Sequence, residues 1–346
     1  MDSKSTNSAA AFNRVPLHIP SGPSVCWWVG LLLTFQMGLA LGGCDSAGPP
    51  DEQGNTPGLP EPPVQSFPRW SPDGDRVLYY DHGLVRYDPE TNRSEHDRNR
   101  KGLWTMRPDG TDRRQVLAGA SLYGDWSPGG DSLVFERGGQ IYKAAYEGGI
   151  VDTASIVRLT SKGSNFFPAW SPEGQWVAYD SNVESPGGLI FIWKMRATGS
   201  RQKRIAYAPE TGEIRQPSWS PDGKHVAHYR YGRYEGSTAP EIFVMSSGGE
   251  DATRLTFNEV RDENPRFSPD SEWLTFESDS QVWIMNADGS DKKRLTERGG
   301  QPDWSPDGNH IVYIGPEHTI WVMDADGSDK QQLTTRPEGP VGQGES

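Results

Sequence analysis

The chain has 346 residues, enough to bury a substantial core, and a formal net charge of −13. An acidic balance of this size excludes nucleic acid as an expected partner. The 40 Gly and 28 Pro favour many tight turns, and the 13 Trp, 12 Tyr and 11 Phe are suited to strands. Composition therefore predicts short strands joined by tight turns.

The amino-terminal part is typical of an export signal. A polar start with Lys4 and Arg14 precedes an apolar run over 25–41, which leads into Leu-Gly-Gly-Cys. This order predicts a lipoprotein-type signal peptide over 1–43, with Cys44 as the lipidated first residue of a mature chain that faces the periplasm or the cell exterior. The alternatives are an uncleaved membrane anchor, or an ordinary signal peptide followed by an incidental cysteine.

Two segments have compositions that do not favour folding. Residues 44–66 are rich in Pro, Gly and acidic residues and almost free of large apolar side chains, so we expect a flexible tether. We expect residues 337–346 to form a disordered tail. The folded domain is then predicted over 67–336.

One phrase, an aromatic residue followed by Ser-Pro, recurs six times in this domain. Its copies begin at Trp70, Trp126, Trp170, Trp219, Phe267 and Trp304. Successive copies are 37 to 56 residues apart. Repeats at this spacing indicate propeller blades or a solenoid. In each copy we expect four strands: one that ends at the aromatic residue, an apolar run, a run such as Ile-Trp-Val-Met, and a run such as Arg-Leu-Thr.

The turn residues predict how these strands are connected. In Ser71-Pro72-Asp73-Gly74, the serine caps the turn, the proline fixes the first central torsion and the glycine takes a positive φ, so the phrase predicts a hairpin. A second glycine-marked hairpin joins strands three and four. Because strand direction alternates, both hairpins are expected on one face and the longer, more variable connections on the other.

The third strands place large side chains in one stripe. Five of the six copies carry Met two residues after an aromatic side chain, at Met106, Met195, Met245, Met285 and Met323. This regularity predicts packing between neighbouring sheets. Six sheets that must cover both faces stack most simply around a closed ring, so the sequence predicts an all-β, six-bladed β-propeller.

These motifs resemble those of the TolB-type WD40-like β-propeller family, whose unit contains Pro-x-Trp-Ser-Pro-Asp-Gly, Ile-Tyr-Val-Met-Asp-x-Asp-Gly and Arg-Leu-Thr. The resemblance extends from Phe67 to about Thr335 and implies the propeller fold. Similar blades occur in periplasmic TolB, in propellers of prolyl-oligopeptidase-type peptidases and in oligogalacturonate lyases. The resemblance therefore implies a fold rather than one function.

Two groups of residues are candidates for binding. The fourth blade concentrates aromatic and basic side chains, the types that anchor interfaces, at His228, Tyr229, Arg230, Tyr231, Arg233 and Tyr234. The alternative for this group is a core histidine followed by a solvated loop. Charged residues just before the repeated aromatic residue are expected to line the central channel, namely Arg69, Asp125, Arg266 and Asp303, unless strand alternation sends them between the blades.

Motifs for chemistry are missing from the sequence. It contains no Gly-x-Ser-x-Gly elbow, phosphate loop or His-Glu-x-x-His, and its seven histidines have no ligand spacing. We therefore expect no catalytic residue, cofactor or metal, and a monomeric, lipid-anchored module that binds or scaffolds an envelope protein or peptide. The alternative is a carbohydrate-active enzyme, of the polysaccharide lyase or hydrolase type, that uses the channel.

Overall fold

The structure is a computed structural model that describes residues 62–206, 212–232 and 239–339. All of them belong to the second of two compact units, 57–346. The predicted signal peptide, Cys44 and the tether up to residue 61 lie outside the described residues. Among the residues that are described, no helix has the length and apolar character needed to cross a membrane.

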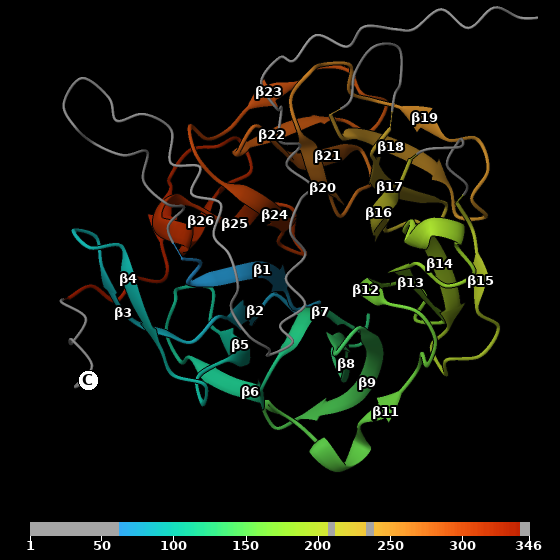
Figure 1. Cartoon of the computed structure of the whole chain (residues 1–346). Coiled ribbons are helices and arrows are strands. Elements are labelled where there is room, and N and C mark those ends of the chain that lie inside the picture. The colour runs from blue at the N-terminus through green and yellow to red at the C-terminus, as the bar shows by residue number, and fades with distance from the viewer. Residues whose placement is uncertain (1–61, 207–211, 233–238, 340–346) are drawn as a thin grey trace, which may run out of the picture. The chain divides into compact units, whose positions relative to one another are not determined.

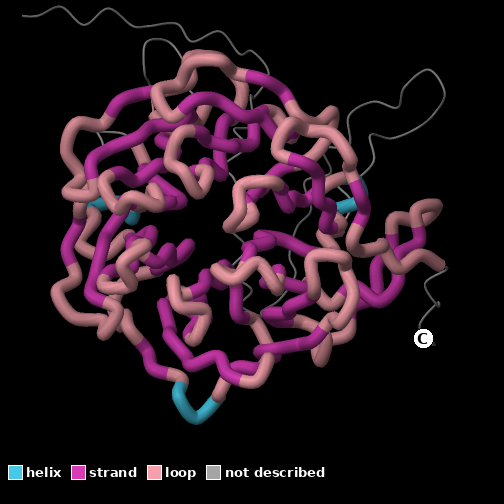
Figure 2. The backbone as a smooth tube through the Cα atoms, turned by 180° about the vertical axis from the view of Figure 1, so that it is seen from behind, coloured by secondary structure: helices cyan, strands magenta, loops and turns pink. Residues whose placement is uncertain are grey.

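Six antiparallel sheets surround a central axis, as Figures 1 and 2 show from opposite sides, which confirms the predicted six-bladed β-propeller. The innermost strands are β1 (Gln65–Trp70), β7 (Ser121–Trp126), β12 (Asn165–Trp170), β16 (Ile214–Trp219), β20 (Asp262–Phe267) and β24 (Gly300–Trp304). The second strands are β2 (Val77–Asp81), β8 (Ser132–Arg137), β13 (Trp176–Ser181), β17 (His225–Arg230), β21 (Trp273–Ser278) and β25 (His310–Ile314).

The third and fourth strands complete each blade. The third strands are β5 (Gly102–Met106), β9 (Gln140–Glu147), β14 (Phe191–Arg196), β18 (Glu241–Ser246), β22 (Gln281–Asn286) and β26 (Ile320–Asp324). The fourth strands are β6 (Arg114–Ala118), β15 (Lys203–Arg204), β19 (Thr253–Arg254), β23 (Lys293–Arg294) and β27 (Gln331–Gln332). In blade 2, β10 (Ile150–Val151) and β11 (Val157–Arg158) both pair with β9.

The repeated Ser-Pro-Asp-Gly phrase forms the hairpin between the first two strands of a blade. In blade 1 the Ser71 hydroxyl donates to Asp73 Oδ1 at 2.5 Å and accepts from the backbone N–H of Arg76 at 2.9 Å. Gly74 has the positive φ, 77°, that returns the chain. Pro306 of blade 6 lies 3.9 Å from the point where a Cβ on Gly74 would sit, so the turns of the first and last blades are in contact.

The core lies between the blades, as the methionine stripe predicted. The five stripe methionines are at most 1% exposed, and the aromatic residues two positions earlier are less deeply buried. One apolar cluster combines Val77 and Met106 of blade 1 with Val312 and Ile320 of blade 6. The first and last blades therefore pack on each other like any other neighbouring pair, and the ring is closed by sequence-contiguous blades.

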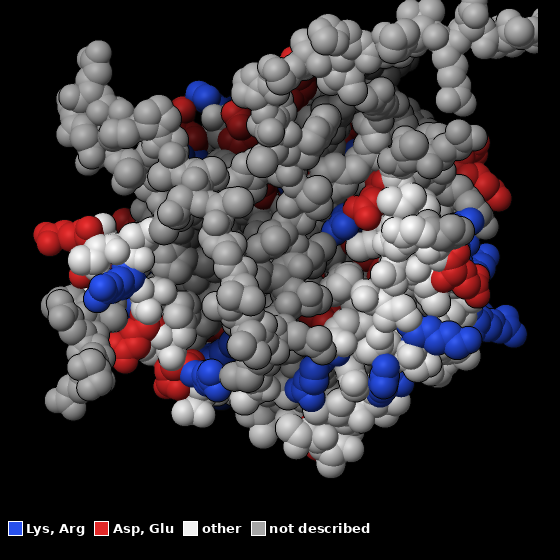
Figure 3. Space-filling view, in the orientation of Figure 1, with Lys and Arg blue, Asp and Glu red and all other residues white. Residues whose placement is uncertain are grey.

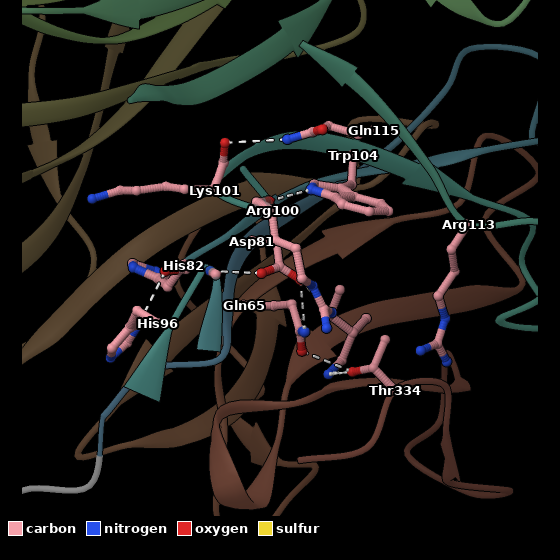
Figure 4. A network of polar contacts seen from close by, with 12 residues as sticks. Gln65, Asp81, His82, His96, Arg100, Lys101, Trp104, Arg113, Gln115 and Thr334 are labelled. Carbon is pink, nitrogen blue, oxygen red and sulfur yellow. Dashed lines mark hydrogen bonds and ion pairs between the residues drawn. The ribbon is translucent and has the colours of Figure 1, made fainter. Parts of the chain in front are cut away.

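A threonine after the fourth strand completes several blades, and the last of these threonines also closes the ring. Thr334 Oγ1 accepts from the backbone N–H of Ile320 at 2.8 Å and donates to Gln65 Oε1 of blade 1 at 3.0 Å. Gln65 Nε2 in turn donates to Asp81 Oδ2 at 3.3 Å (Figure 4). Thr160, Thr256 and Thr296 accept the equivalent backbone N–H in their own blades.

The two ends of the domain extend beyond the predicted boundaries. Strand β1 begins at Gln65, and Val64 is 1% exposed, so the folded part begins before Phe67. At the other end, residues 337–339 are not a free tail, because Tyr87 exchanges backbone hydrogen bonds with Pro337 and Gly339 at 3.0 Å. Tyr87 belongs to β3 (Leu84–Asp88), which pairs with β4 (Arg93–His96) in an inserted hairpin.

This hairpin gives the long connection of blade 1 a structural role. Arg336 lies over the Tyr87 ring at 3.9 Å and donates to the carbonyl oxygen of Pro62 at 3.2 Å. Val64, Leu84 and Tyr87 form a small apolar cluster beneath this contact. The hairpin therefore holds both ends of the propeller together.

We predict that Thr334→Val destabilises the protein although it preserves the shape of the side chain. The substitution removes the acceptor of the Ile320 N–H and the donor to Gln65 at a site that is 1% exposed. The expected loss is about 1–3 kcal/mol in the free energy of unfolding, measured by chemical denaturation. The exposed Thr198→Val is the control, and equal stabilities for the two variants would contradict the assignment.

Candidate functional site

Every innermost strand contains a β-bulge at the same repeat position. The register against the second strand shifts just before the repeated aromatic residue, in blade 1 between Ser66 and Arg69, and at equivalent positions in the other blades. Proline follows the bulged residue in five blades and Gly124 does so in blade 2. Because proline has no N–H to donate to the ladder, its place in mid-strand favours a bulge.

The six bulged residues have a left-handed backbone although none of them is glycine. Their φ angles lie between 47° and 56°. Such residues are uncommon, cost about 1–3 kcal/mol each, and cluster at functional sites. We call this ring of residues the throat; it consists of Phe67, Tyr123, Phe167, Gln216, Asn264 and Gln301.

One half of the throat is aromatic. The Tyr123 and Phe167 rings are 3.9 Å apart between centroids, and the Phe67 ring meets them edge-on at 4.8 Å and 5.5 Å. These rings come from blades 1, 2 and 3, so they meet where the innermost strands converge. All three are partly exposed. They form an apolar wall on this side of the throat, called the aromatic wall below.

The other half of the throat consists of carboxamides, which bond to neighbouring blades. Gln301 Oε1 accepts from the backbone N–H of Phe67 at 2.7 Å, and Gln216 Oε1 accepts from that of Asn264 at 3.2 Å. Asn264 Nδ2 donates to Glu277 Oε2 at 2.9 Å. These side chains satisfy backbone groups that the bulges leave out of the ladder.

Three carboxyl groups lie behind the throat on second strands. Asp180 Oδ1 accepts from the backbone N–H of Gln216 at 2.9 Å, and Glu277 Oε2 accepts from that of Gln301 at 3.1 Å. Burial raises the pKa of Glu136 and of Glu277 to about 7 and that of Asp180 well above its usual value. Burial therefore makes each of these three groups harder to ionise than an exposed carboxyl group.

The four residues predicted to line the channel come together nearer the hairpin turns. Asp303 Oδ2 accepts from the backbone N–H of Trp70 at 2.9 Å, and Asp125 Oδ2 accepts from that of Trp170 at 2.8 Å. Arg266 Nε lies 3.9 Å from Asp303 Oδ1. Burial lowers the pKa of Arg69 to about 9, with Arg266 acting in the same direction.

This quartet of charged residues joins neighbouring blades. Burial raises the pKa of Asp125 and of Asp303, and the two arginines oppose that shift for both carboxyl groups. Two guanidinium groups therefore face two carboxyl groups with balanced formal charge. Each aspartate also connects its own innermost strand to that of the next blade.

The structure separates the six residues predicted to contact a partner in blade 4. His228 is fully buried, and Tyr229 and Arg230 are 5% and 9% exposed, so these three do not form a surface contact. His228 Nε2 accepts from Arg230 Nε at 2.9 Å, and its ring stacks on Phe243. Burial lowers the His228 pKa well below its usual value, so the ring is neutral. The alternative of a core histidine fits this geometry.

The remaining three residues have different positions. Tyr231 is half-buried, and its hydroxyl donates to Glu263 Oε1 at 2.9 Å. Arg261 donates to the same carboxylate oxygen at 2.6 Å. Glu263 immediately precedes the throat residue Asn264, so Tyr231 lies next to the throat. Arg233 and Tyr234 lie outside the described residues.

The described side chains offer little for catalysis. Ser66 Oγ lies 3.0 Å from His82 Nε2, the spacing of a nucleophile and a base. Burial lowers the pKa of His82 to about 4, however, so the ring is a poor general base at neutral pH. In the part of the chain that the structure describes, no three or more His, Cys, Asp or Glu side chains are arranged to hold a metal ion.

Sequence analysis selected the residue just before the repeated aromatic residue as a candidate for the channel, and did not single out the residue two positions earlier. The structure shows that this earlier residue has the left-handed backbone in every blade. The signal was the proline between these positions, as in Phe67-Pro68-Arg69. A proline in the middle of a predicted strand indicates a bulge, and the residue before it then departs from the regular alternation.

Six antiparallel blades, hairpins that begin with Ser-Pro and bulges that proline marks in five blades define a six-bladed propeller of the TolB type. The family model for the TolB beta propeller domain matches residues 157–340, and the chain belongs to this family.

Relatives support this assignment. An uncharacterized protein of Agrobacterium fabrum is 28% identical over 206 residues, and the match covers 55% of this chain and 64% of that protein. A putative TolB from Agrobacterium tumefaciens superposes with a TM-score of 0.56 at 25% identity, covering 64% of this chain and 84% of that one. TolB from Acinetobacter baumannii gives 0.58 at 22% identity, covering 74% and 62%. The chain thus spans less than two thirds of the curated relative's length.

The buried Glu277 predicts a pH-dependent contribution to stability. Burial is the largest cause that raises its pKa from 4.5 to about 7, and the charge of Glu263 is the next. Between these two pH values the folded state keeps a proton that the unfolded chain releases. This contribution to the free energy of unfolding therefore decreases as pH rises. We expect Glu277→Gln to gain roughly 2 kcal/mol relative to the wild type between about pH 5 and about pH 8. A stability difference that stays constant with pH, in urea denaturation, would contradict this.

Proposed function

We propose that the chain is an exported, lipid-anchored propeller that binds a protein or peptide ligand of the bacterial envelope at the throat, without catalysis of its own and as a monomer. The throat is the observation that carries this proposal. Three partly exposed aromatic rings from three blades meet there, on a backbone held in a strained conformation at six equivalent positions.

The physical properties of the throat favour binding. Aromatic side chains bring large contact area at a low entropic cost, because each has only two side-chain torsions. The backbone beneath them is fixed by contacts between blades, such as the Gln301 bond to Phe67, so little ordering is needed when a ligand binds. Tyr231 and Arg261 extend the site, because their contact to Glu263 lies next to Asn264.

The face of the molecule that is drawn in Figure 3 carries charges of both signs. Figure 3 shows Lys and Arg side chains gathered along the lower margin of the face drawn in Figure 1, with Asp and Glu toward both sides. Polar rims of this kind surround apolar centres in protein interfaces and set orientation more than affinity. The combination fits a folded or extended polypeptide as the ligand.

We predict that a photo-crosslinking amino acid at Tyr123 captures a specific partner in intact cells. Tyr123 is partly exposed in the throat, whereas Ile150, at 58% exposure on β10 of blade 2, is the control position. The expected result is a discrete adduct at Tyr123 that is missing from Ile150, seen by immunoblotting and identified by mass spectrometry. The same adducts at both positions, or none at Tyr123, would refute binding at the throat.

A second prediction concerns the membrane anchor. Cys44 follows Leu-Gly-Gly at the end of the apolar run, so Cys44→Ser should abolish both lipid attachment and signal processing at this site. We expect the wild-type chain to incorporate radiolabelled palmitate and the variant to lose the label. A Cys26→Ser variant is the control and should keep it. Equal labelling of the wild type and Cys44→Ser would exclude Cys44 as the site.

A further inference from the structure

We propose that the throat is a subsite for an organic cation, an alkylammonium or guanidinium group such as the side chain of lysine or arginine. The inference rests on the proposed function and specifies the chemistry of the group that enters the throat. It follows from three observations: the aromatic rings of the throat, the carboxyl groups beside them, and the pairing of the nearby arginines with other carboxylates.

The aromatic wall is the first element of this subsite. A cation is attracted to the face of an aromatic ring because the ring's quadrupole places negative potential there. The attraction strengthens where water is excluded. Phe67, Tyr123 and Phe167 meet at centroid distances of 3.9 to 5.5 Å and remain partly exposed.

Carboxyl groups stand beside this wall. Glu136 is directly opposite Leu122 in the β7–β8 ladder, and Leu122 is the neighbour of the throat residue Tyr123. Asp180 is directly opposite Phe166 in the β12–β13 ladder, and Phe166 is the neighbour of the throat residue Phe167. Glu136 and Asp180 therefore lie on the aromatic side of the throat, where a cation would rest.

Asp180 has an unused hydrogen-bond acceptor. Its side chain is fully buried, and Oδ1 accepts from the backbone N–H of the throat residue Gln216 at 2.9 Å. Oδ2 has no hydrogen-bond partner among the described residues. A buried carboxylate oxygen without a donor is costly, and a ligand N–H at the throat would supply that donor.

The basic residues near the throat are already paired. Arg215 donates to Glu213 at 2.8 Å, and Arg261 donates to Glu263 at 2.6 Å. Within the described ranges, Glu136, Asp180 and Glu277 form no ion pair with a lysine or arginine. The throat therefore has more carboxyl groups than local cations. A cation beside these carboxyl groups would favour their ionised form, which burial otherwise disfavours, so a positively charged ligand fits the site better than an anionic one.

The test measures binding of small probes to the full chain purified in detergent. Isothermal titration would compare N-acetyl-lysine amide, N-acetyl-arginine amide and tetramethylammonium with the uncharged N-acetyl-norleucine amide. We expect the cations to bind and the norleucine probe to bind at least about tenfold more weakly. Tighter binding of the two amino-acid amides than of tetramethylammonium assigns the cation to a peptide, and the reverse order assigns it to a free quaternary amine.

Two near-isosteric variants connect this binding to the throat. Phe167→Leu removes a ring but keeps an apolar side chain, and Asp180→Asn removes the carboxylate but keeps the acceptor for Gln216. Each should weaken binding of the charged probes by about 3- to 20-fold. The control Phe257→Leu removes a ring that is 65% exposed and should leave binding unchanged.

The outcomes separate this inference from the proposed function. Equal binding of charged and uncharged probes, or unchanged cation binding in both throat variants, would overturn the cation subsite. Circular dichroism identifies a variant that does not fold, and Glu136→Gln then replaces Asp180→Asn. A specific adduct at Tyr123 together with indifference to probe charge would keep the throat as a binding site for an uncharged group, so the two hypotheses fail separately.

Discussion

The burial of both faces of every blade against its two neighbours is the constraint on which this structure depends. A four-stranded sheet with fully buried methionines in its third strand, such as Met195 or Met245, has no stable free face. Each blade therefore needs a neighbour on either side, and only a closed ring provides one for all six. The cluster shared by Val77 and Val312 shows that the first and last blades meet this requirement directly.

Closure of the ring also explains the composition of the throat. When six sheets converge, their innermost strands come closest near the axis, and the bulges turn one residue per blade out of the regular ladder. The backbone N–H groups that leave the ladder must find other acceptors, and side chains such as Gln301 and Asp180 of the preceding blade provide them. Because the blades must pack on one another, one side chain per blade is presented in a ring at the centre. The identity of this side chain can differ from one repeat to the next.

Much of the fold follows from local sequence. Ser71 to Gly74 specify a hairpin through hydrogen bonds and torsions within a few residues. The six copies of the aromatic residue followed by Ser-Pro give the number of blades. The repeat alignment also brought together Arg69, Asp125, Arg266 and Asp303, because equivalent positions in a ring face the same axis. Local patterns could not identify the pairing of residues 337–339 with Tyr87, which depends on two segments far apart in the chain.

The candidate site was harder to predict for a related reason. His228 differed from its aligned aromatic neighbours, but sequence alone cannot distinguish a buried histidine stacked on Phe243 from one that faces a partner. The bulged residues are aromatic in blades 1 to 3 and carboxamides in blades 4 to 6 already in the sequence, but their arrangement as two halves of one throat follows from the closed ring. The unsatisfied Asp180 Oδ2 is a property of three-dimensional packing, with no counterpart in a motif.

The entry of the chain into its innermost strand has a mechanical consequence. Tension transmitted from residues before Pro62 would be applied to β1 at the hub, where Trp70 and Phe67 bond to Asp303 and Gln301 of the last blade. An outer strand under the same load would peel away one hydrogen bond at a time, whereas β1 is held from both sides and by Arg336 at its entrance. A propeller pulled from its amino-terminal side would therefore resist unfolding at the strand on which the force acts.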